Sequence, residues 1–221
     1  LREIIKRLAR LGLSPAQLDA ILVTHEHADH IHGVELLARH YQIPVYLSAG
    51  TLSGMRRPVH PAELLRAGQR LAIRGLEVQV VGVSHDAREP TQFVLSDGQR
   101  RFGMLTDLGM ATAEVLECYR AVDALVVEAN HDSTMLAGGP YPYFLKARVG
   151  GSRGHLNNHQ SAELVKQLDW GRMQHLVLAH LSEKNNSPQL ARQTFVDTLG
   201  CDPGWLQVAD QHSGLDWREI A

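Results

Sequence analysis

The segment from Thr24 to His30 concentrates residue types that bind transition metals. It places His25, His27, Asp29 and His30 within six consecutive positions, directly after the apolar run 20–23. Neutral imidazole and carboxylate together form the ligand set that suits zinc, manganese or iron. Residues two apart point the same way in an extended loop, so His25 and His27 can share one ion. Asp29 and His30 lie where the chain should turn into a helix, and they can swing to a second ion.

Three later apolar strands also end in residues that can bind a metal. The strand-end residues are His85, Asp107 and His180. A single histidine after a strand is more often a hydrogen-bonded edge residue than a ligand. A series of such strand ends, starting with three histidines and an aspartate, favours one metal centre at a shared end of the sheets.

The composition bounds the class of protein and its partners. The chain has 221 residues, 44% hydrophobic and 21% charged, which is ordinary for a soluble globular protein and predicts a single domain over 1–221. The net charge of -2 excludes a global field that attracts nucleic acid, so any polyanion site must be local. Cys118 and Cys201 have no metal or redox spacing, which favours a reducing, cytoplasmic compartment. No run approaches the ~18 apolar residues of a membrane span.

The elements that must position these residues alternate between strands and helices. A helix start at Ser14 has serine as cap, proline next and glutamine third, and Asp97-Gly98 is a hairpin signal. Residues 48–68 are expected to be irregular, and 138–154 form a stretch rich in glycine, proline and tyrosine. Strands are predicted at 19–24, 45–47, 71–73, 76–83, 92–95, 101–106, 124–127, 175–179 and 206–209, and helices at 30–41, 112–119, 158–168 and 187–198. This order predicts an α/β protein with two sheets and helices outside them.

The order His-x-His-x-Asp-His, then His, Asp and His, resembles the metallo-β-lactamase fold hydrolases. That resemblance implies a four-layer αββα sandwich around two divalent ions, zinc or manganese with iron as a third option. A hydroxide bridging ions about 3.5–4 Å apart would attack phosphorus or a carbonyl carbon. By matching position, metal one would be held by His25, His27 and His85, metal two by Asp29, His30 and His180, and both would be bridged by Asp107.

Two further segments resemble the phosphodiesterase branch of that superfamily, in the style of tRNase Z and RNase J. Gly154-His155 stands before a helix, and the strand 122–130 carries Glu128. In tRNase Z the matching glutamate and histidine pair for proton transfer, so Glu128 and His155, with Asp29, are the candidate catalytic residues. Val127 stands where that family has a histidine.

The overall pattern is most similar to bacterial YycJ/WalJ-type proteins, which are described as metal-dependent 5′-to-3′ exonucleases on DNA. The shared segments are 19–27, 83–86, 128–132, 145–148 and 154–156. That group normally opens with a β-hairpin before the first helix, whereas this chain begins at that helix. We therefore expect the first N-terminal β-hairpin to be missing.

The stretch before His155 carries the candidate phosphate contacts, which are Lys146, Arg148, Arg153 and Gly154. Cationic side chains and glycine backbone suit phosphate oxygens, although a solvated surface loop explains them equally well. Arg56 and Arg57 are expected to be solvated. Tyr141, Tyr143 and Phe144 could stack on a base, but core packing is the expectation. His131 is expected to cap a loop.

The sequence therefore predicts a dinuclear phosphodiesterase that acts as a nuclease. DNA is the first expectation for its substrate, and RNA is the alternative. A thioesterase or lactonase of glyoxalase type would share every metal ligand. A diiron redox protein on the same fold usually has glutamate where this chain has His27, so the histidine argues against that class. A non-catalytic binding module would be expected to have lost metal ligands, and none is missing here. The oligomeric state stays open.

Overall fold

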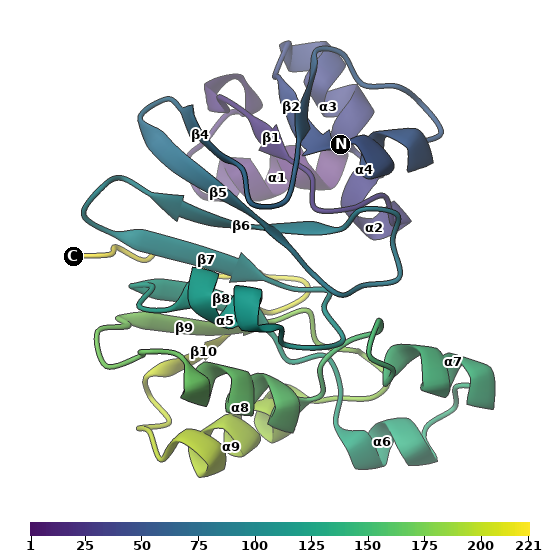
Figure 1. Cartoon of the computed structure of the whole chain (residues 1–221), viewed down its shortest axis with the longest axis vertical. Helices are drawn as coiled ribbons and strands as arrows, with labels where there is room; N and C mark the ends of the chain where they lie inside the picture. The colour runs from purple at the N-terminus through teal and green to yellow at the C-terminus, as the bar shows by residue number, and fades with distance from the viewer. The chain divides into compact units, whose positions relative to one another are not determined.

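The computed structural model describes residues 1–221 (Figure 1). The chain divides into two compact units. Unit 1 consists of Leu1–Gly82 and Ala87–Phe93, and unit 2 of Val83–Asp86 and Val94–Ala221. The strand β6 (Thr91–Ser96) begins in unit 1 and ends in unit 2. The single domain over 1–221 stays a prediction. No helix of the chain has the length and apolar character that crossing a bilayer requires.

Unit 1 contains a small parallel sheet and an antiparallel strand pair. The sheet has the order β1-β2-β3, with Ile21 opposite Val45 and Val45 opposite Ala62. Strands β4 and β5 pair antiparallel. The elements are α1 (Arg2–Arg10), a 3₁₀ turn (Pro15–Gln17), β1 (Ile21–Leu22), α2 (Ala28–Ile31), α3 (Val34–Tyr41), β2 (Val45–Ser48), α4 (Ala49–Gly54), β3 (Ala62–Leu65), β4 (Arg70–Ile73) and β5 (Leu76–Gly82).

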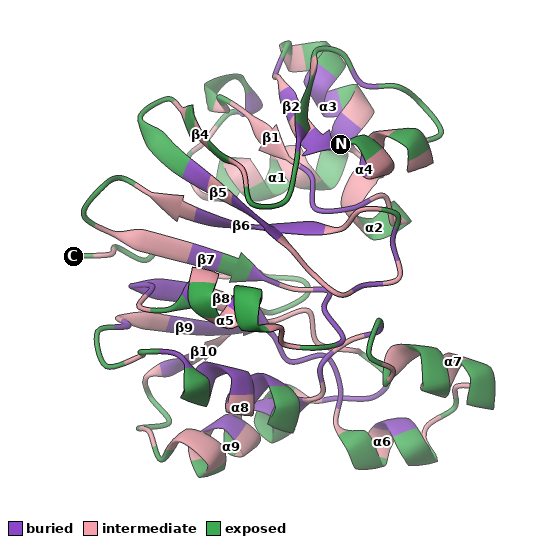
Figure 2. Cartoon of the chain, viewed as in Figure 1, coloured by how far each residue is buried: buried purple, intermediate pink, exposed green.

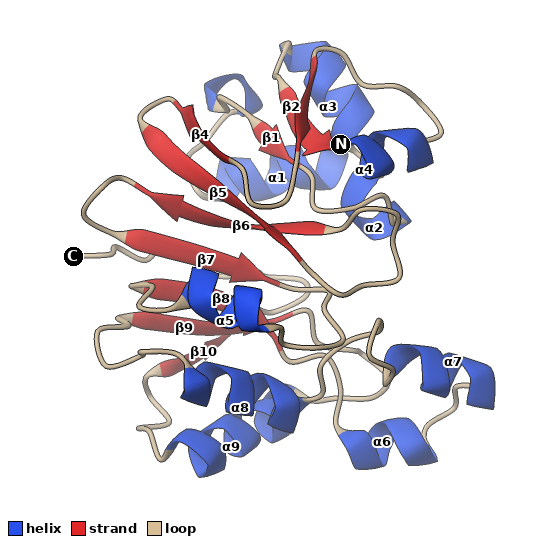
Figure 3. Cartoon of the chain, in the orientation of Figure 1, coloured by secondary structure: helices blue, strands red, loops and turns tan.

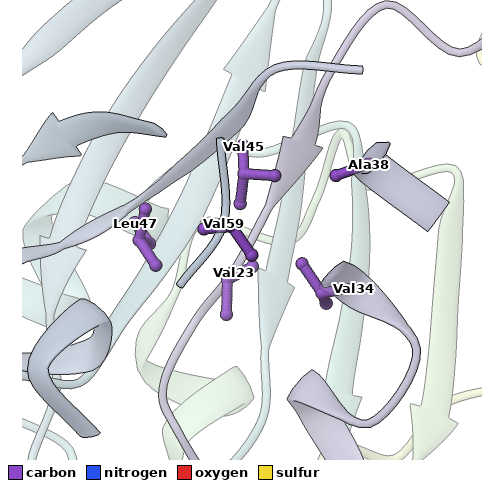
Figure 4. Close-up of a cluster of buried hydrophobic side chains, with 6 residues drawn as sticks. All are labelled: Val23, Val34, Ala38, Val45, Leu47 and Val59. Atoms are coloured by element: carbon purple, nitrogen blue, oxygen red, sulfur yellow. The ribbon is translucent and has the colours of Figure 1, made fainter. Parts of the chain in front are cut away.

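The core of unit 1 forms where α3 lies on the parallel sheet (Figure 4). Helix α3 contributes one apolar face, and the sheet contributes residues of β2 and of the segment after β1. Their packing fixes the point at which the chain leaves β1, which is where the histidine-rich segment starts. The buried members of this cluster are Val23, Val34, Ala38, Val45, Leu47 and Val59.

Unit 2 is built on parallel strands in the order β10-β9-β8-β7. The next strand in the sheet is β6, which a hairpin joins to β7. Helix α9 packs against β10 and α8 packs against α9 (Figure 3), and Tyr119 of α5 donates to the carbonyl oxygen of Met104 in β7. The elements are β7 (Arg101–Leu105), α5 (Ala113–Tyr119), β8 (Ala124–Glu128), α6 (Ser133–Gly138), α7 (Tyr143–Val149), α8 (Asn158–Gln167), β9 (His175–Ala179), α9 (Pro188–Leu199) and β10 (Leu206–Val208).

The register of the parallel strands sets the place of the site in unit 2. Leu105 of β7 lies opposite Val127 of β8, and Glu128 of β8 lies opposite Ala179 of β9. Parallel strands end at one edge of the sheet, and ligands bind at that edge in open α/β sheets. The register therefore brings the residues that follow β7, β8 and β9 to the same edge.

Several local predictions are confirmed. The α/β class holds, with helices beside sheets in both units. Ser14 caps its turn in a reciprocal box with Gln17. The hairpin at Asp97-Gly98 joins β6 and β7, with Gly98 in the left-handed region at φ 92°. Helices at 158–168 and 187–198 form within one residue of the predicted ends.

Other local predictions are wrong. The helix over 30–41 is two helices, α2 and α3, because Gly33 stands between them and glycine is unfavourable in a helix interior. The stretch 48–68 is not irregular throughout, since Ser48 caps α4 and β3 pairs with β2. In the stretch 48–68 a cap and a strand pairing therefore outweigh the weak local pattern.

Candidate metal centre

The histidines of the segment Thr24–His30 lie together in unit 1. The ring centroids of His25 and His27 are 4.5 Å apart, and those of His25 and His30 are 4.1 Å apart. Oγ1 of Thr24 lies 3.0 Å from Nδ1 of His25 and 3.3 Å from Nδ1 of His30. Because the threonine hydroxyl occupies the Nδ1 side of both rings, metal binding would use their Nε2 atoms.

The local chain path explains this grouping. His25 and His27 are in the extended segment after β1, and His27 caps α2 with an extended backbone. Asp29 and His30 are in α2, where Oδ2 of Asp29 lies 3.6 Å from Nε2 of His30. His25 is fully buried, whereas Asp29 is exposed. Unit 1 therefore brings together all four residues predicted from this segment.

A cleft of about 720 Å³ in unit 1 borders His27. Ile31, Leu36 and Met55 give it an apolar wall, and Arg56 and Arg57 lie at its exposed side. Nη1 of Arg57 is 3.9 Å from Oε2 of Glu35. An ion pair in solvent contributes little to the stability of the protein. The expectation that both arginines are solvated is confirmed.

In unit 2 the side chains after β7, β8 and β9 converge as the register requires. Asp107 and His180 both have left-handed backbone, each at φ 55°. That conformation is costly for a residue with a side chain, and such residues cluster at functional sites. Here it turns both side chains at the strand ends, so that Oδ1 of Asp107 is 3.5 Å from Nε2 of His180.

His85 completes this group from the loop after β5. Its Nε2 is 3.9 Å from Oδ1 of Asp107, and its Nδ1 donates to the carbonyl oxygen of Gly154 at 3.0 Å. Burial lowers the pKa of His85, against the raising effect of Asp107. A neutral imidazole with its Nδ1 held by a carbonyl is the form in which histidine binds a metal through Nε2.

Glu128 is the fully buried carboxylate of unit 2 that organises the site. Its oxygens accept the backbone N–H groups of Asp107 at 3.0 Å, Leu108 at 3.2 Å and Leu156 at 2.8 Å. Burial acts to raise the pKa of Glu128, but hydrogen bonds from His155 and His180 outweigh it and lower that pKa. The carboxylate is therefore held ionised.

His155 is half-buried and lies beside Glu128. Nδ1 of His155 lies 3.1 Å from Oε2 of Glu128, so the carboxylate favours a proton on Nδ1. The ring centroids of His85 and His180 are 5.1 Å and 5.3 Å away. His131, predicted to cap a loop, is buried, and burial followed by the charge of His155 lowers its pKa.

The predicted phosphate contacts are engaged within unit 2. Arg148 forms an ion pair with Asp86, Lys146 donates to the carbonyl oxygen of Ala137 at 2.6 Å, and Arg153 donates to that of His85 at 3.3 Å. The contacts of Arg148 and Arg153 hold α7 and the turn before His155 against the His85 loop. Both arginines remain largely exposed, so a phosphate role stays a prediction.

Sequence reasoning missed three residues that hold the site. Thr24 contacts two imidazoles, Asp86 pairs with Arg148, and Asn130 donates to the carbonyl oxygen of His180 at 3.1 Å. Their positions carried a signal, because each directly precedes or follows a motif residue or its strand. Core packing of Tyr143 and Phe144 is wrong, since both are exposed.

The donor sets of unit 2 fit a divalent ion. Oδ1 of Asp107 lies 3.9 Å from Nε2 of His85 and 3.5 Å from Nε2 of His180, and all three residues are among the predicted ligands. Zinc bound at about 2.0–2.1 Å places two ligand atoms roughly 3.4 Å apart. Small side-chain movements would bring the donor atoms to this separation. Their nitrogen and oxygen atoms suit zinc or manganese.

Comparison with known proteins agrees with this chemistry. The model of the β-lactamase superfamily domain matches residues 2–181. The chain is 34% identical over 224 residues to "Exodeoxyribonuclease WalJ" of Streptococcus pneumoniae serotype 2 (strain D39 / NCTC 7466), covering 98% of this chain and 81% of that protein. It is 34% identical over 202 residues to "Exodeoxyribonuclease YycJ" of Bacillus anthracis, covering 89% and 76%. The crystal structure of the metallo-β-lactamase fold protein YhfI from Bacillus subtilis has a TM-score of 0.68 at 18% identity, covering 95% and 82%.

Proposed function

The chain belongs to the metallo-β-lactamase superfamily of hydrolases, and from that premise we propose that it is a metal-dependent exodeoxyribonuclease that degrades DNA from 5′ to 3′. The fold predicted from the motif order is confirmed by the family match and by the likeness to YhfI. The similarity to WalJ and YycJ, over 98% and 89% of this chain, supports DNA as the substrate, ahead of RNA. The proposed place of action is the cytoplasm.

The proposed ligand sets follow the family's motif order. His25, His27 and His85 would hold one divalent ion, and Asp29, His30 and His180 a second, with Asp107 shared. Support comes from the clustering of the imidazoles in unit 1 and from the Asp107 geometry in unit 2. Bound divalent ions supply Lewis acidity toward a phosphate oxygen and bring the pKa of water toward neutrality.

The Glu128–His155 pair is the observation that carries the phosphodiesterase assignment. The buried carboxylate fixes Nδ1 of His155, which leaves Nε2 as the atom that can pass a proton to the leaving oxygen. Asp29 is the third proposed catalytic residue, because its exposed carboxylate stands next to His30. A thioesterase of glyoxalase type would share the metal ligands, so the substrate test must include it.

The experiment combines metal analysis of pure protein with digestion of end-labelled single- and double-stranded DNA. We expect bound zinc or manganese and release of nucleotides from the 5′ end, abolished by a chelator. S-lactoylglutathione is assayed in parallel. The His155→Ala variant should lose DNA cleavage, whereas the matched variant of the exposed His159 should retain it. Hydrolysis of S-lactoylglutathione without cleavage of DNA would overturn the proposal.

A further inference from the structure

Two neighbouring aromatic side chains stand in solvent at the start of α7. Tyr143 is 86% exposed and Phe144 is 73% exposed. Figure 2 shows α7, and α6 beside it, mostly in the colour of exposed residues. Leaving two large rings exposed forgoes the stabilisation that burial would bring. Two adjacent exposed rings on one short helix therefore indicate a surface that binds a partner.

The base of this segment is held firmly to unit 2. A Cβ on Gly139 would lie 2.5 Å from Oδ1 of Asn185, so the chain packs tightly there. Lys146 ties α7 back to Ala137 of α6. At the other end of α7, the N–H of His155 donates to the carbonyl oxygen of Val149 at 2.8 Å. The helix that carries the two rings is therefore held in place by contacts within unit 2.

The same helix links the rings to the proposed catalytic histidine. Helix α7 has seven residues, so it is roughly 10 Å long, and the turn that follows it leads directly to His155. A nucleic acid strand whose end reaches His155 could therefore run along α7 to the two rings.

The charge of the segment indicates what kind of partner it suits. Residues 133–154 contain Lys146, Arg148 and Arg153 and no aspartate or glutamate, although the whole chain has a net charge of -2. Because Arg148 is paired with Asp86, the net positive charge of the segment comes from Lys146 and Arg153. A local cationic stretch with exposed aromatic rings matches the chemistry of single-stranded nucleic acid, in which phosphates alternate with bases that stack. An apolar protein partner would not need the cations.

We propose that Tyr143 and Phe144 form a stacking platform for unpaired bases next to the DNA end that is cleaved. This inference rests on the proposed nuclease function and names the form of its substrate, a single-stranded 5′ end. Every base has a π-face, so the platform takes any sequence. A paired duplex hides those faces, so it engages the platform only where its end is unpaired.

Binding is the first test, because it does not depend on hydrolysis. A labelled oligothymidine with phosphorothioate linkages at its 5′ end is titrated with wild type, Tyr143→Ala, Phe144→Ala and the double variant. Loss of one ring should weaken binding by roughly tenfold, and loss of both should weaken it further. Tyr143→Phe and Phe144→Tyr keep the rings and should bind as wild type does. Trp217→Ala, which removes an aromatic ring that is 63% exposed elsewhere in unit 2, is the matched control.

Activity separates this inference from the proposed function. With the double variant, KM for single-stranded DNA should rise about as much as the dissociation constant, while hydrolysis of bis(4-nitrophenyl) phosphate stays unchanged. If the wild type cleaves neither DNA nor this ester, the nuclease function is wrong. If the wild type cleaves DNA and the double variant binds and cleaves it equally well, the platform is wrong. Loss of self-association in the double variant, with DNA binding intact, would likewise overturn the platform and assign the rings to contact between copies.

Discussion

Oε2 of Glu128 lies 3.1 Å from Nδ1 of His155, within unit 2. The same buried carboxylate accepts backbone N–H groups from the Asp107 loop and from Leu156. One acid therefore fixes both the loop that carries Asp107 and the orientation of the His155 ring. This double role makes the pair testable by a mutant cycle.

His155→Ala should lower kcat by about 10²–10⁴, the usual value of general acid catalysis, and leave the metal content unchanged. Glu128→Gln should cause a related loss. If the two act as a unit, the double variant should lose much less than the product of the single effects. Circular dichroism serves as the folding control, because Glu128 accepts three backbone N–H groups. A double variant that shows the full product, or a His155→Ala protein that loses metal, would refute the pairing.

Asp107→Ala should be more damaging to activity and metal content than loss of any single terminal ligand. Its carboxylate is proposed to serve both ions and to offset their repulsion. Asp107 also has left-handed backbone, which asparagine tolerates better than alanine. Asp107→Asn therefore separates loss of charge from backbone strain. Greater residual activity in Asp107→Ala than in His180→Ala would rule out the shared ligand.

Purified protein saturated with zinc or manganese should hold two ions per chain. The proposed ligands outnumber the four that a single zinc ion usually takes. Elemental analysis after removal of excess metal measures the ratio. Dialysis against a chelator should abolish activity, and added metal should restore it. A ratio of one ion per chain after saturation would contradict the dinuclear assignment.

Gly109→Ala should disturb the turn that carries His155. A Cβ at this position would lie 2.6 Å from the carbonyl oxygen of Gly151 and 2.5 Å from the carbonyl carbon of Ser152, so the backbone must move. Overpacking of this kind typically costs about 1–3 kcal/mol. We expect a lower melting temperature and lower kcat. Gly138→Ala is the matched control, because nothing lies within 4 Å of its Cβ. Equal behaviour of the two variants would contradict the close packing.

Tyr119→Phe should destabilise the protein by about 1 kcal/mol near neutral pH, because the fully buried hydroxyl donates to the carbonyl oxygen of Met104 at 2.6 Å. Burial, and then the neighbouring Cys118, raise the pKa of Tyr119 well above its usual value. The folded state therefore keeps the phenol proton when the unfolded state has lost it. Stability from this group is complete below the unfolded pKa of about 10 and falls as pH rises above it.

The measurement is urea unfolding of wild type and Tyr119→Phe across this alkaline range. The variant lacks the ionisable phenol, so its stability should fall less steeply above about pH 10. Parallel losses in the two proteins would show that Tyr119 does not contribute to the alkaline transition.

The sequence by itself determined the family, the α/β class and the residues that could bind a metal. His25, His27, Asp29 and His30 are neighbours along the chain, and the other candidates follow apolar strands. Those are local patterns, so a single chain displays them without its partners. The Asp97-Gly98 hairpin was readable for the same reason, since its turn depends on the preferences of two adjacent residues.

Only the tertiary structure decided which polar groups meet and which apolar groups stay exposed. Asp86 and Arg148 pair across 62 positions, and Glu128 gathers N–H groups from two distant loops. The exposure of Tyr143 and Phe144 has the same origin, because burial depends on whether another segment covers a side chain. Composition supplies the aromatic rings, whereas contacts between segments far apart in the sequence determine whether they join a core or face solvent.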